Sequence, residues 1–534
     1  MLAAMKFPSA ASLPQEVRSG VPEFPRWPIP ALLVAVMFGN LAYIRWACPF
    51  DLAPDEAHYW DWSRSLDWCY YSKGPLVALL IRVSCELFGA TAFAVRLPAV
   101  LCGTALLAGM TKLALQVSGE RRFAFAVLLA ALTLPGVSAA GVLMTIDAPF
   151  LACWAWAAVC VHSALTWKSH AVPAWCVAGA FVALGLLAKP TMILFPIGVA
   201  LLLLQQRSLS TWKCLPFAGI AALGLVPSIV WNLRQDGVGL WHALGHSGLR
   251  EPWPGVLGPL GFLGGQFGIL LGVWFVAWLR AVGTFRPWAR PETALLWWLS
   301  VPLFAVCTGA SLKTPGQPNW PAAAYVTGFV LAMLWVREQG RTPAVRGAVL
   351  AAVVLGIASS AYLRWPGILR PTLARLAGEP TEDRPAPVRR LDPTARLLGW
   401  NDLAREVDLV REQVRAETGA EALIATMTWT VPGELGFYCR GNPTVYSFGL
   451  ALADRFSQYD IWRPNPVLDA QAFRGRTFVY VGEALPEGAF DRMEPVRQVT
   501  PTRDGVPVAS WKIWICRGFR GFGPPDDRGH PLRY

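Results

Sequence analysis

The chain contains 534 residues, of which 54% are hydrophobic and only 15% are charged, whereas an average soluble domain is roughly 25% charged. With a mean hydropathy of +0.39, this composition excludes an ordinary soluble protein and predicts a polytopic membrane protein. The 47 Lys and Arg residues outnumber the 35 Asp and Glu residues, which gives a net charge of +12. Because the basic residues lie in short loops between apolar runs, the excess indicates the positive-inside pattern, and we expect no nucleic-acid partner.

The first apolar run covers residues 27–47 and is about 20 residues long, which is enough to span a bilayer. It ends in Tyr-Ile-Arg-Trp-Ala-Cys-Pro, without the small-residue cleavage site of a signal peptide. We therefore predict an uncleaved first helix, preceded by a cytoplasmic N-terminal segment at residues 1–27.

An acidic pair, Asp55 and Glu56, lies in the segment that follows, residues 48–73, which ends at Lys73. Charged groups beside the hydrocarbon layer are costly unless they serve a substrate or a pathway, so this segment marks a candidate functional site. A simpler interpretation is also open. In it, Asp55 caps an interfacial helix at residues 56–64, and Lys73 is a helix-end lysine whose ammonium reaches the headgroups.

Further apolar runs follow, and with the first they predict a helical membrane domain at residues 28–363 with about 11–13 transmembrane helices. The runs lie near residues 75–90, 97–116, 122–140, 148–166, 172–188, 190–204, 214–231, 258–279, 293–311, 320–336 and 347–363. Basic residues mark the loops that we expect in the cytoplasm, near residues 119–122, 167–168, 205–213, 280–290 and 337–346. The remaining loops then face outward.

This topology constrains the second and third apolar runs. If the basic loop at residues 119–122 is cytoplasmic, the runs at 75–90 and 97–116 cannot both cross the membrane completely. We therefore expect one of them to be short, broken or re-entrant, which is tolerated where protein or a water-filled cavity covers the backbone. The same topology places Asp147 on the outer side, together with Asp55.

The composition changes after residue 366, and we predict a soluble periplasmic α/β domain at residues 364–534. A charged helical stretch is expected near residues 401–420, and strand-like runs separated by turn residues follow it, near 422–427, 444–447, 477–481 and 508–515. Neither a phosphate-loop lysine motif nor a GxGxxG motif after a strand occurs in the sequence, which argues against an ATP-driven pump.

An outward-facing membrane cavity with two carboxylate positions and a lysine suits group transfer from a lipid-phosphate donor. One carboxylate takes the proton of the acceptor, and the cation offsets the charge on the departing phosphate. Because nucleotide sugars are not available outside the cytoplasm, an activated sugar there must be carried by a membrane lipid.

Short motifs through the membrane part carry a family resemblance. They are Pro54-Asp55-Glu56-Ala57-His58-Tyr59-Trp60, Lys73-Gly74-Pro75, Arg96-Leu97-Pro98, Thr145-Ile146-Asp147-Ala148-Pro149, Lys189-Pro190-Thr191, and Lys313 with Pro318-Asn319-Trp320-Pro321. In this order they resemble the GT-C glycosyltransferases, in particular the bacterial lipid A aminoarabinose transferases and the dolichyl-phosphate-mannose-protein mannosyltransferase-like proteins. The resemblance implies a GT-C fold and an inverting transfer from an undecaprenyl-phosphate sugar to a lipid A-like, glycan or protein acceptor, at the periplasmic face of the inner membrane.

The resemblance also implies roles for individual residues. Asp55 would be the catalytic base, Glu56 its partner and Asp147 the second acidic motif. The donor phosphate would be bound by Lys73, Lys189 and Lys313. Substrate contacts are expected from Tyr59, Tyr70, Tyr71, His242, His246 and Asn319. Some members use a divalent metal ion, for which Asp55 and Glu56 would be the ligands. Aminoarabinose transferases have Lys-Pro-Pro where this chain has Lys73-Gly74-Pro75, which leaves the identity of the sugar open.

Alternatives remain for several of these residues. Asp147 could cap the helix that follows it, and Lys189 could be a turn residue. His242 and His246, four residues apart, could bind a metal on one helical face, but the glycines around them argue against a firm helix and favour a solvated or phosphate-contacting pair. The competing functions for the whole chain are a multi-span transporter or lipid flippase and a membrane scaffold, which would leave the Asp55 and Lys73 pattern without a purpose.

Overall fold

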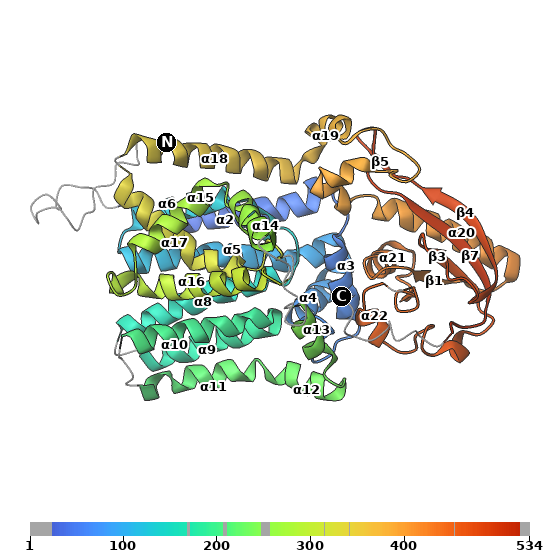
Figure 1. The fold of residues 1–534 in the computed structure, drawn as a ribbon, viewed down its shortest axis with the longest axis horizontal. Coiled ribbons are helices and arrows are strands. Elements are labelled where there is room, and N and C mark those ends of the chain that lie inside the picture. The colour runs from blue at the N-terminus through green and yellow to red at the C-terminus, as the bar shows by residue number, and fades with distance from the viewer. Residues whose placement is uncertain are drawn as a thin grey trace, which may run out of the picture.

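The computed structural model describes residues 24–167, 171–206, 211–246, 257–313, 316–340, 342–452 and 454–523. Most of the expected cytoplasmic segment, residues 1–27, lies outside these ranges. A bundle of roughly parallel and antiparallel helices carries a smaller domain with a twisted sheet at one end (Figure 1). The predicted fold class, a helical membrane domain followed by an α/β domain, is therefore confirmed.

Helices cover every apolar run of the sequence. In chain order they are α2 (Pro28–Ala42), η3 (Tyr43–Ala47), α3 (Pro54–Arg64), α4 (Leu76–Phe88), α5 (Ala92–Ser118), α6 (Arg121–Leu132), α7 (Pro135–Ala140), α8 (Asp147–Thr166), α9 (Ala171–Ala188), η5 (Pro190–Ile193), α10 (Leu194–Gln205), η6 (Thr211–Cys214), α11 (Leu215–Leu223), α12 (Val226–Arg234), α13 (Val238–His246), α14 (Leu257–Ile269), α15 (Val273–Thr284), η7 (Pro291–Thr293), α16 (Ala294–Ala310), α17 (Ala322–Gln339) and α18 (Pro343–Arg364).

Within the described ranges, seven helices are long and apolar enough to cross a membrane, or eight if the bent pair α14 and α15 is one span. The chain is a multi-pass membrane protein. This count is lower than the predicted 11–13 because several apolar runs form shorter helices. Among these, α4 has 13 residues and α6 and α10 have 12 each.

The short helix α4 explains how the two apolar runs at 75–90 and 97–116 fit the predicted topology, in which they cannot both cross the membrane. At 1.5 Å per residue, its 13 residues rise about 20 Å, which is less than the roughly 30 Å of hydrocarbon in a bilayer. The next helix, α5, has 27 residues and is long enough to cross. Gly89, at φ 76°, separates the two helices, and the Thr91 side chain caps α5 by accepting a hydrogen bond from the Ala94 N–H. The run at residues 75–90 is therefore the short one.

Loops with basic residues gather at the end of the bundle away from the C-terminal domain (Figure 1). Arg337 pairs with Glu120 at 3.6 Å, and Arg290 with Glu338 at 3.5 Å. The Gln205 side chain donates to the Pro287 carbonyl at 2.7 Å. These contacts join loops that the charge pattern assigned to one side. The assignment of that side to the cytoplasm stays a prediction.

The C-terminal domain contains α-helices, short 3₁₀ turns and seven strands in the described part. They are η8 (Pro366–Ile368), α19 (Arg370–Ala377), η9 (Pro387–Arg390), η10 (Pro393–Leu397), α20 (Trp400–Thr418), β1 (Leu423–Thr426), α21 (Pro432–Tyr438), β2 (Val445–Ser447), α22 (Gln458–Ile461), η11 (Ala470–Phe473), β3 (Phe478–Val481), β4 (Phe490–Val499), β5 (Thr502–Arg503), β6 (Val506–Pro507) and β7 (Trp511–Phe519). The main sheet has the order β2-β1-β3-β7-β4, with β1 parallel to β2 and β3, and β7 antiparallel to its neighbours.

One face of α20 packs on this sheet through a buried apolar cluster that includes Leu403, Val407, Ile424 and Val479. The expected helix and strands of this domain form close to their predicted positions. Strand β4 was not predicted, because it carries many exposed polar residues and a register shift beside Pro495 that interrupt the alternation expected of a strand.

Candidate functional site

Helix α3 positions the acidic pair. Pro54 occupies its first turn, and the Glu56 carboxylate accepts a hydrogen bond from the Ala53 N–H at 2.9 Å, which satisfies one of the free N–H groups at the helix start. Successive residues of a helix point about 100° apart. Asp55 and Glu56 therefore face different surroundings, although they are neighbours in the chain.

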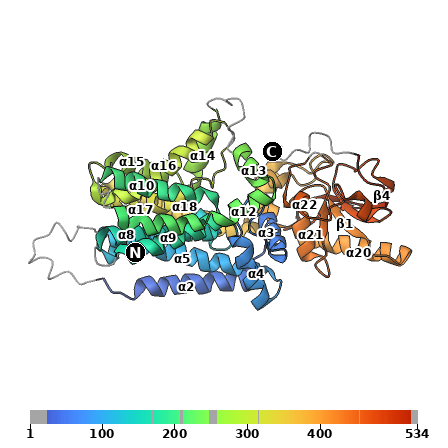
Figure 2. The same cartoon turned by 90° about the horizontal axis from the view of Figure 1, so that it is seen from below.

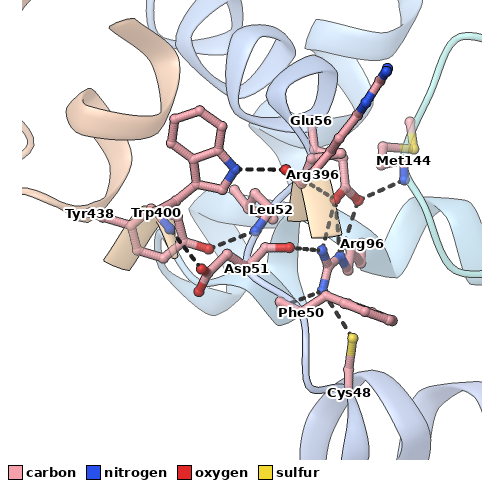
Figure 3. Close-up of polar contacts among 11 residues, drawn as sticks. Cys48, Phe50, Asp51, Leu52, Glu56, Arg96, Met144, Arg396, Trp400 and Tyr438 are labelled. Atoms are coloured by element: carbon pink, nitrogen blue, oxygen red, sulfur yellow. Dashed lines mark hydrogen bonds and ion pairs between the residues drawn. The ribbon is translucent and has the colours of Figure 1, made fainter. Parts of the chain in front are cut away.

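Glu56 faces inward, into a closed polar cluster (Figure 3). Arg96 of α5 donates to it at 2.9 Å, and the Met144 N–H donates to its other oxygen at 2.8 Å. Arg96 also donates to the carbonyl oxygens of Phe50 at 3.2 Å and Asp51 at 2.6 Å. Because both side chains of the ion pair are almost completely buried, Glu56 joins α3 to α5 and to the neighbouring loops. This geometry favours a positioning role for Glu56 over contact with a substrate.

Asp55 lies in the wall of a cavity, where its side chain stays accessible although protein surrounds the cavity and reduces its hydration. The Tyr59 hydroxyl, one turn later on α3, donates to its carboxylate at 3.5 Å. Burial raises the pKa of Asp55, and the positive charges of Lys73 and Arg455 act against this rise. An accessible carboxylate whose pKa lies above its usual value is suited to accept a proton.

The second acidic motif forms a separate, paired group. Asp147 opens α8, and its oxygens accept hydrogen bonds from the Lys189 ammonium at 2.7 Å and from the Asn319 amide at 2.8 Å. Among the described residues no backbone N–H donates to the Asp147 carboxylate, whose oxygens accept from Lys189 and Asn319, so the capping alternative is not realised. Lys189 follows α9 and also lies 5.4 Å from the centre of the Phe150 ring. Motifs far apart in the chain thus meet at one carboxylate.

Lys73 is near enough to both Asp55 and Asp147 for their charges to act on it. Its ammonium makes no hydrogen bond or ion pair with another residue in the described part of the chain. Burial lowers its pKa to about 8, the charges of Lys189 and Arg455 act in the same direction, and Asp55 and Asp147 oppose them. The next residue, Gly74, lies so close to the end of α9 that a Cβ atom would approach the Leu187 carbonyl oxygen to 2.1 Å. Glycine at this position allows the Lys73 loop to lie against α9.

A further cation, Arg455, comes from the C-terminal domain and was not predicted. It follows strand β2, and its guanidinium lies 5.1 Å from the centre of the Trp429 ring, which itself packs 5.4 Å from the His58 ring on α3. Its charge acts on the pKa values of both Asp55 and Lys73. No acidic residue in the described ranges pairs with Arg455. The sequence offered no signal for it, because a lone arginine in a loop has no local pattern.

Of the tyrosines predicted to contact substrate, Tyr59 reaches Asp55, whereas Tyr70 belongs to the core. Tyr70 is buried, stacks on Trp62 at 4.4 Å and donates to the Trp62 carbonyl at 3.1 Å. Tyr71 is also buried, and its backbone N–H donates to Gln458 at 2.7 Å. Packing of the Trp62 and Tyr70 rings therefore explains Tyr70 without a substrate.

The expectation that glycines prevent a helix around His242 is wrong, because α13 forms there. Asn232 stabilises it by accepting a hydrogen bond from the Leu240 N–H at 2.9 Å. The His242 ring is buried and packs 4.4 Å from Tyr71, and α13 lies between the helix bundle and the C-terminal domain in Figure 2. His246 ends α13, and its side chain lies outside the described part.

Lys313, a predicted ligand of the donor phosphate, lies shortly after α16, and residues 314–315 beyond it are outside the described ranges.

Asp55 and Glu56 do not fit as joint ligands of a divalent metal ion, because they face different sides and both Glu56 oxygens are engaged by Arg96 and backbone N–H groups. No group of three or more metal-ligating side chains occurs among the described residues.

A cavity of about 620 Å³ lies between the bundle end and the C-terminal domain, with Asp55 in its wall. The loops after the parallel strands β1 and β3 form another part of the wall, at residues 427–431 and 481–483. The carboxyl ends of parallel strands are the usual ligand-binding edge of an open α/β sheet. The C-terminal domain thus presents this edge to the acidic helix α3.

Comparisons with known proteins agree with this arrangement. The family model described as dolichyl-phosphate-mannose-protein mannosyltransferase matches residues 72–231. The crystal structure of ArnT from Cupriavidus metallidurans in the apo state covers 91% of this chain and 97% of that chain, with a TM-score of 0.58 and 16% identity. Its complex with undecaprenyl phosphate gives a TM-score of 0.57, 17% identity and the same coverage. The chain has the GT-C fold.

Among curated proteins, the chain is 30% identical over 287 residues to the lipid A galacturonosyltransferase RgtD of Rhizobium johnstonii. The aligned region is 53% of this chain and 60% of that relative, so it spans less than two thirds of the relative's length. The predicted resemblance to lipid A sugar transferases and to mannosyltransferase-like proteins is confirmed.

Proposed function

We propose that the chain is a membrane glycosyltransferase that moves a sugar from a polyprenyl-phosphate donor to a lipid A-like acceptor. The observation that carries the proposal is the arrangement around Asp55. This carboxylate is open to a cavity, while two cations without acidic partners in the described part, Lys73 and Arg455, act on it electrostatically. The names of RgtD and of the ArnT complex support the acceptor and donor classes, respectively.

In the proposed reaction, the oxygen of an acceptor hydroxyl attacks the anomeric carbon of the sugar. Asp55 accepts the proton of that hydroxyl. The bond from that carbon to the phosphate oxygen breaks, and polyprenyl phosphate leaves with the bonding electron pair. Because attack comes from the face opposite the leaving group, the configuration inverts. Lys73 and Arg455 stabilise the charge that develops on the phosphate. No nucleotide takes part in this step.

The other charged groups have positioning roles in this proposal. Asp147 holds Lys189 and Asn319 by hydrogen bonds. The Lys189 charge acts on Lys73 and adds to the positive charge offered to the donor phosphate. Glu56 and Arg96 fix α3 and thereby the direction of Asp55. We place the site at the periplasmic face of the bacterial inner membrane, because the basic loops lie at the opposite end of the bundle.

A transporter requires access to its substrate from both sides of the membrane. The charged groups around Asp55 instead lie at one end of the bundle, beside the C-terminal domain, which favours a transferase. Glycan and protein acceptors are the competing outcomes of the test below.

The test uses membranes that contain the full chain or its Asp55→Asn variant at matched protein level. The membranes receive lipid A and undecaprenyl-phosphate sugars, beginning with galacturonic acid and aminoarabinose, and the lipids are analysed by mass spectrometry. We expect lipid A to gain the mass of one sugar with the wild-type chain and not with the variant. Sugar transfer by neither form, or equal transfer by both, would contradict the proposal.

A further inference from the structure

The cavity beside Asp55 has a second group of unpaired charges. Arg389 and Arg396 line it from the segment that links the last span to α20. Neither guanidinium makes a hydrogen bond or an ion pair with any residue in the described ranges. Burial lowers the pKa of Arg389, and the nearby charge of Arg396 adds to this effect. Two arginines that lie close together without an acid are the usual setting for an anion.

The other cations of the cavity wall are already engaged. Arg364 donates to Ser138 at 3.1 Å and to Asn40 at 2.8 Å. Lys512 lies 4.0 Å from the Glu483 carboxylate. These partners leave Arg389 and Arg396 as the available cations of the wall, within the described part of the chain.

The remaining wall suits a glycolipid headgroup. Its apolar residues lie at the domain-side ends of the first and last spans, with Tyr43 and Leu363 among them, where the acyl chains of a lipid would enter. Trp400, Trp429 and Trp511 add flat aromatic surfaces, of the kind that cover sugar rings. The volume of about 620 Å³ lies within the range of roughly 300–1,000 Å³ typical of small-ligand sites.

Asp55 lies in the wall of this cavity, and Trp429, which also lines it, carries Arg455 on its ring. Lys73 and Arg455 act on the Asp55 carboxylate but do not line the cavity. A general base must reach the acceptor hydroxyl on one side, while the departing phosphate lies across the sugar from it.

We propose that this cavity binds the acceptor, and that Arg389 and Arg396 recognise a phosphate group on its glycolipid headgroup. The inference rests on the proposed function, since it assigns the acceptor side of the same reaction. It adds that the acceptor is phosphorylated and that its recognition depends on the C-terminal domain. The donor phosphate binds elsewhere, at Lys73 and Arg455.

Binding measurements test this directly, with the purified full chain in detergent and microscale thermophoresis. The probes are bis-phosphorylated lipid A, the same lipid A after enzymatic dephosphorylation, undecaprenyl phosphate and inorganic phosphate. For the double variant Arg389→Gln/Arg396→Gln we expect affinity for bis-phosphorylated lipid A to fall tenfold or more, with affinity for undecaprenyl phosphate unchanged. Wild-type chain should prefer bis-phosphorylated over dephosphorylated lipid A by a similar factor. Arg390→Gln is the matched control, because Arg390 is exposed and does not line the cavity.

Equal binding of both lipid A forms by the wild-type chain, or unchanged binding by the double variant, would overturn the inference. Saturation of the site by inorganic phosphate at concentrations as low as those of lipid A would assign it to free phosphate instead. A fall in binding of both lipid A and undecaprenyl phosphate would indicate damage to the fold. These readouts do not need turnover, so they separate the inference from the proposed function, which fails if Asp55→Asn leaves transfer intact.

Discussion

Asp55 and Glu56 are consecutive residues on one helix, yet they belong to regions of opposite character. The Glu56 carboxylate is paired on both oxygens within the protein, by Arg96 and by backbone N–H groups, and the Arg96 ion pair is closed to solvent. Around Asp55 the carboxylate is open to a cavity, and nearby cations have no acidic partner among the described residues. A buried charge that is paired within the protein is expected to stabilise the fold. Accessible charges without partners are expected to contact a ligand.

Breaking the closed region should have the largest effect. Arg96→Met leaves Glu56 buried without its cation, and removal of one member of a buried ion pair typically costs about 3–5 kcal/mol. We expect little folded protein, or a strongly reduced Tm by fluorescence-detected thermal unfolding in detergent. The double variant Glu56→Gln/Arg96→Met removes both charges and should recover part of that loss. An unchanged Tm in Arg96→Met would show that the pair does not hold α3.

Changing the open region should affect reaction rate and leave stability intact. Lys73→Ala removes a cation that meets the donor phosphate in both the ground and the transition state, so it should raise the donor KM and lower kcat. A combined loss in kcat/KM of about tenfold to a hundredfold corresponds to roughly 1.4–2.8 kcal/mol. Steady-state kinetics with an undecaprenyl-phosphate sugar provide the measurement. Wild-type kinetics in the variant would place the phosphate site elsewhere.

The pH profile gives a sharper test of the same lysine. The Lys73 ammonium is charged below its pKa of about 8, so activity should fall as the pH rises through that value. On the acid side, activity should fall as Asp55 is protonated, at a pH above the usual aspartate range because its pKa is raised. Lys73→Arg, which stays charged, should have lower activity but lose the alkaline decline. An alkaline limb that persists in this variant would belong to another group.

The closed region also contains a buried carboxylate without a hydrogen-bond partner, Glu434, and replacing it with a neutral side chain should have the smallest effect. Glu434 of α21 is fully buried, and neither of its carboxylate oxygens has a hydrogen-bond partner among the described residues. Burial raises its pKa well above the usual value. In the unfolded chain the group ionises at its ordinary pKa, so the folded state binds the extra proton and stability declines as pH rises above about 4.5.

Glu434→Gln removes the buried ionisable group, so it should raise the free energy of unfolding at neutral pH by about 1 kcal/mol, the typical gain of a single stabilising substitution. It should also flatten the dependence of Tm on pH. Thermal unfolding of both forms at pH 5 and pH 8 measures this. A variant that is less stable than wild type at pH 8 would mean that the ionised carboxylate is stabilised in the fold.

Much of this molecule could be predicted from the sequence, because the bilayer imposes a length and a composition on its helices. Each apolar run of the sequence contains a helix. The charge pattern required that either the run at 75–90 or the run at 97–116 be short, broken or re-entrant, and α4, in the first of these runs, is short. The motifs brought Asp147, Lys189 and Asn319 together, because each follows or precedes an apolar run at the same end of the bundle.

The rest depended on packing, which a motif does not encode. Tyr70 stands beside Lys73 in the sequence, yet its ring is in the core. Glu56 looks like Asp55 in the sequence, and only the Arg96 contact distinguishes them. The C-terminal domain contributes Arg455, Arg389 and Arg396 from loops without repeating pattern, so nothing local indicated that they lie near α3.

The account is tested most directly by comparing Asp55→Asn with Glu56→Gln in the same preparation. For each, Tm and the rate of sugar transfer per folded molecule are measured with the same donor and acceptor. We predict that Asp55→Asn keeps the wild-type Tm and loses about 10²-fold or more in rate, whereas Glu56→Gln lowers the Tm and leaves the rate per folded molecule within a few-fold of wild type. A Glu56→Gln variant that is as stable as wild type but inactive, or an Asp55→Asn variant that is unstable but active when folded, would contradict the division of roles between these two residues.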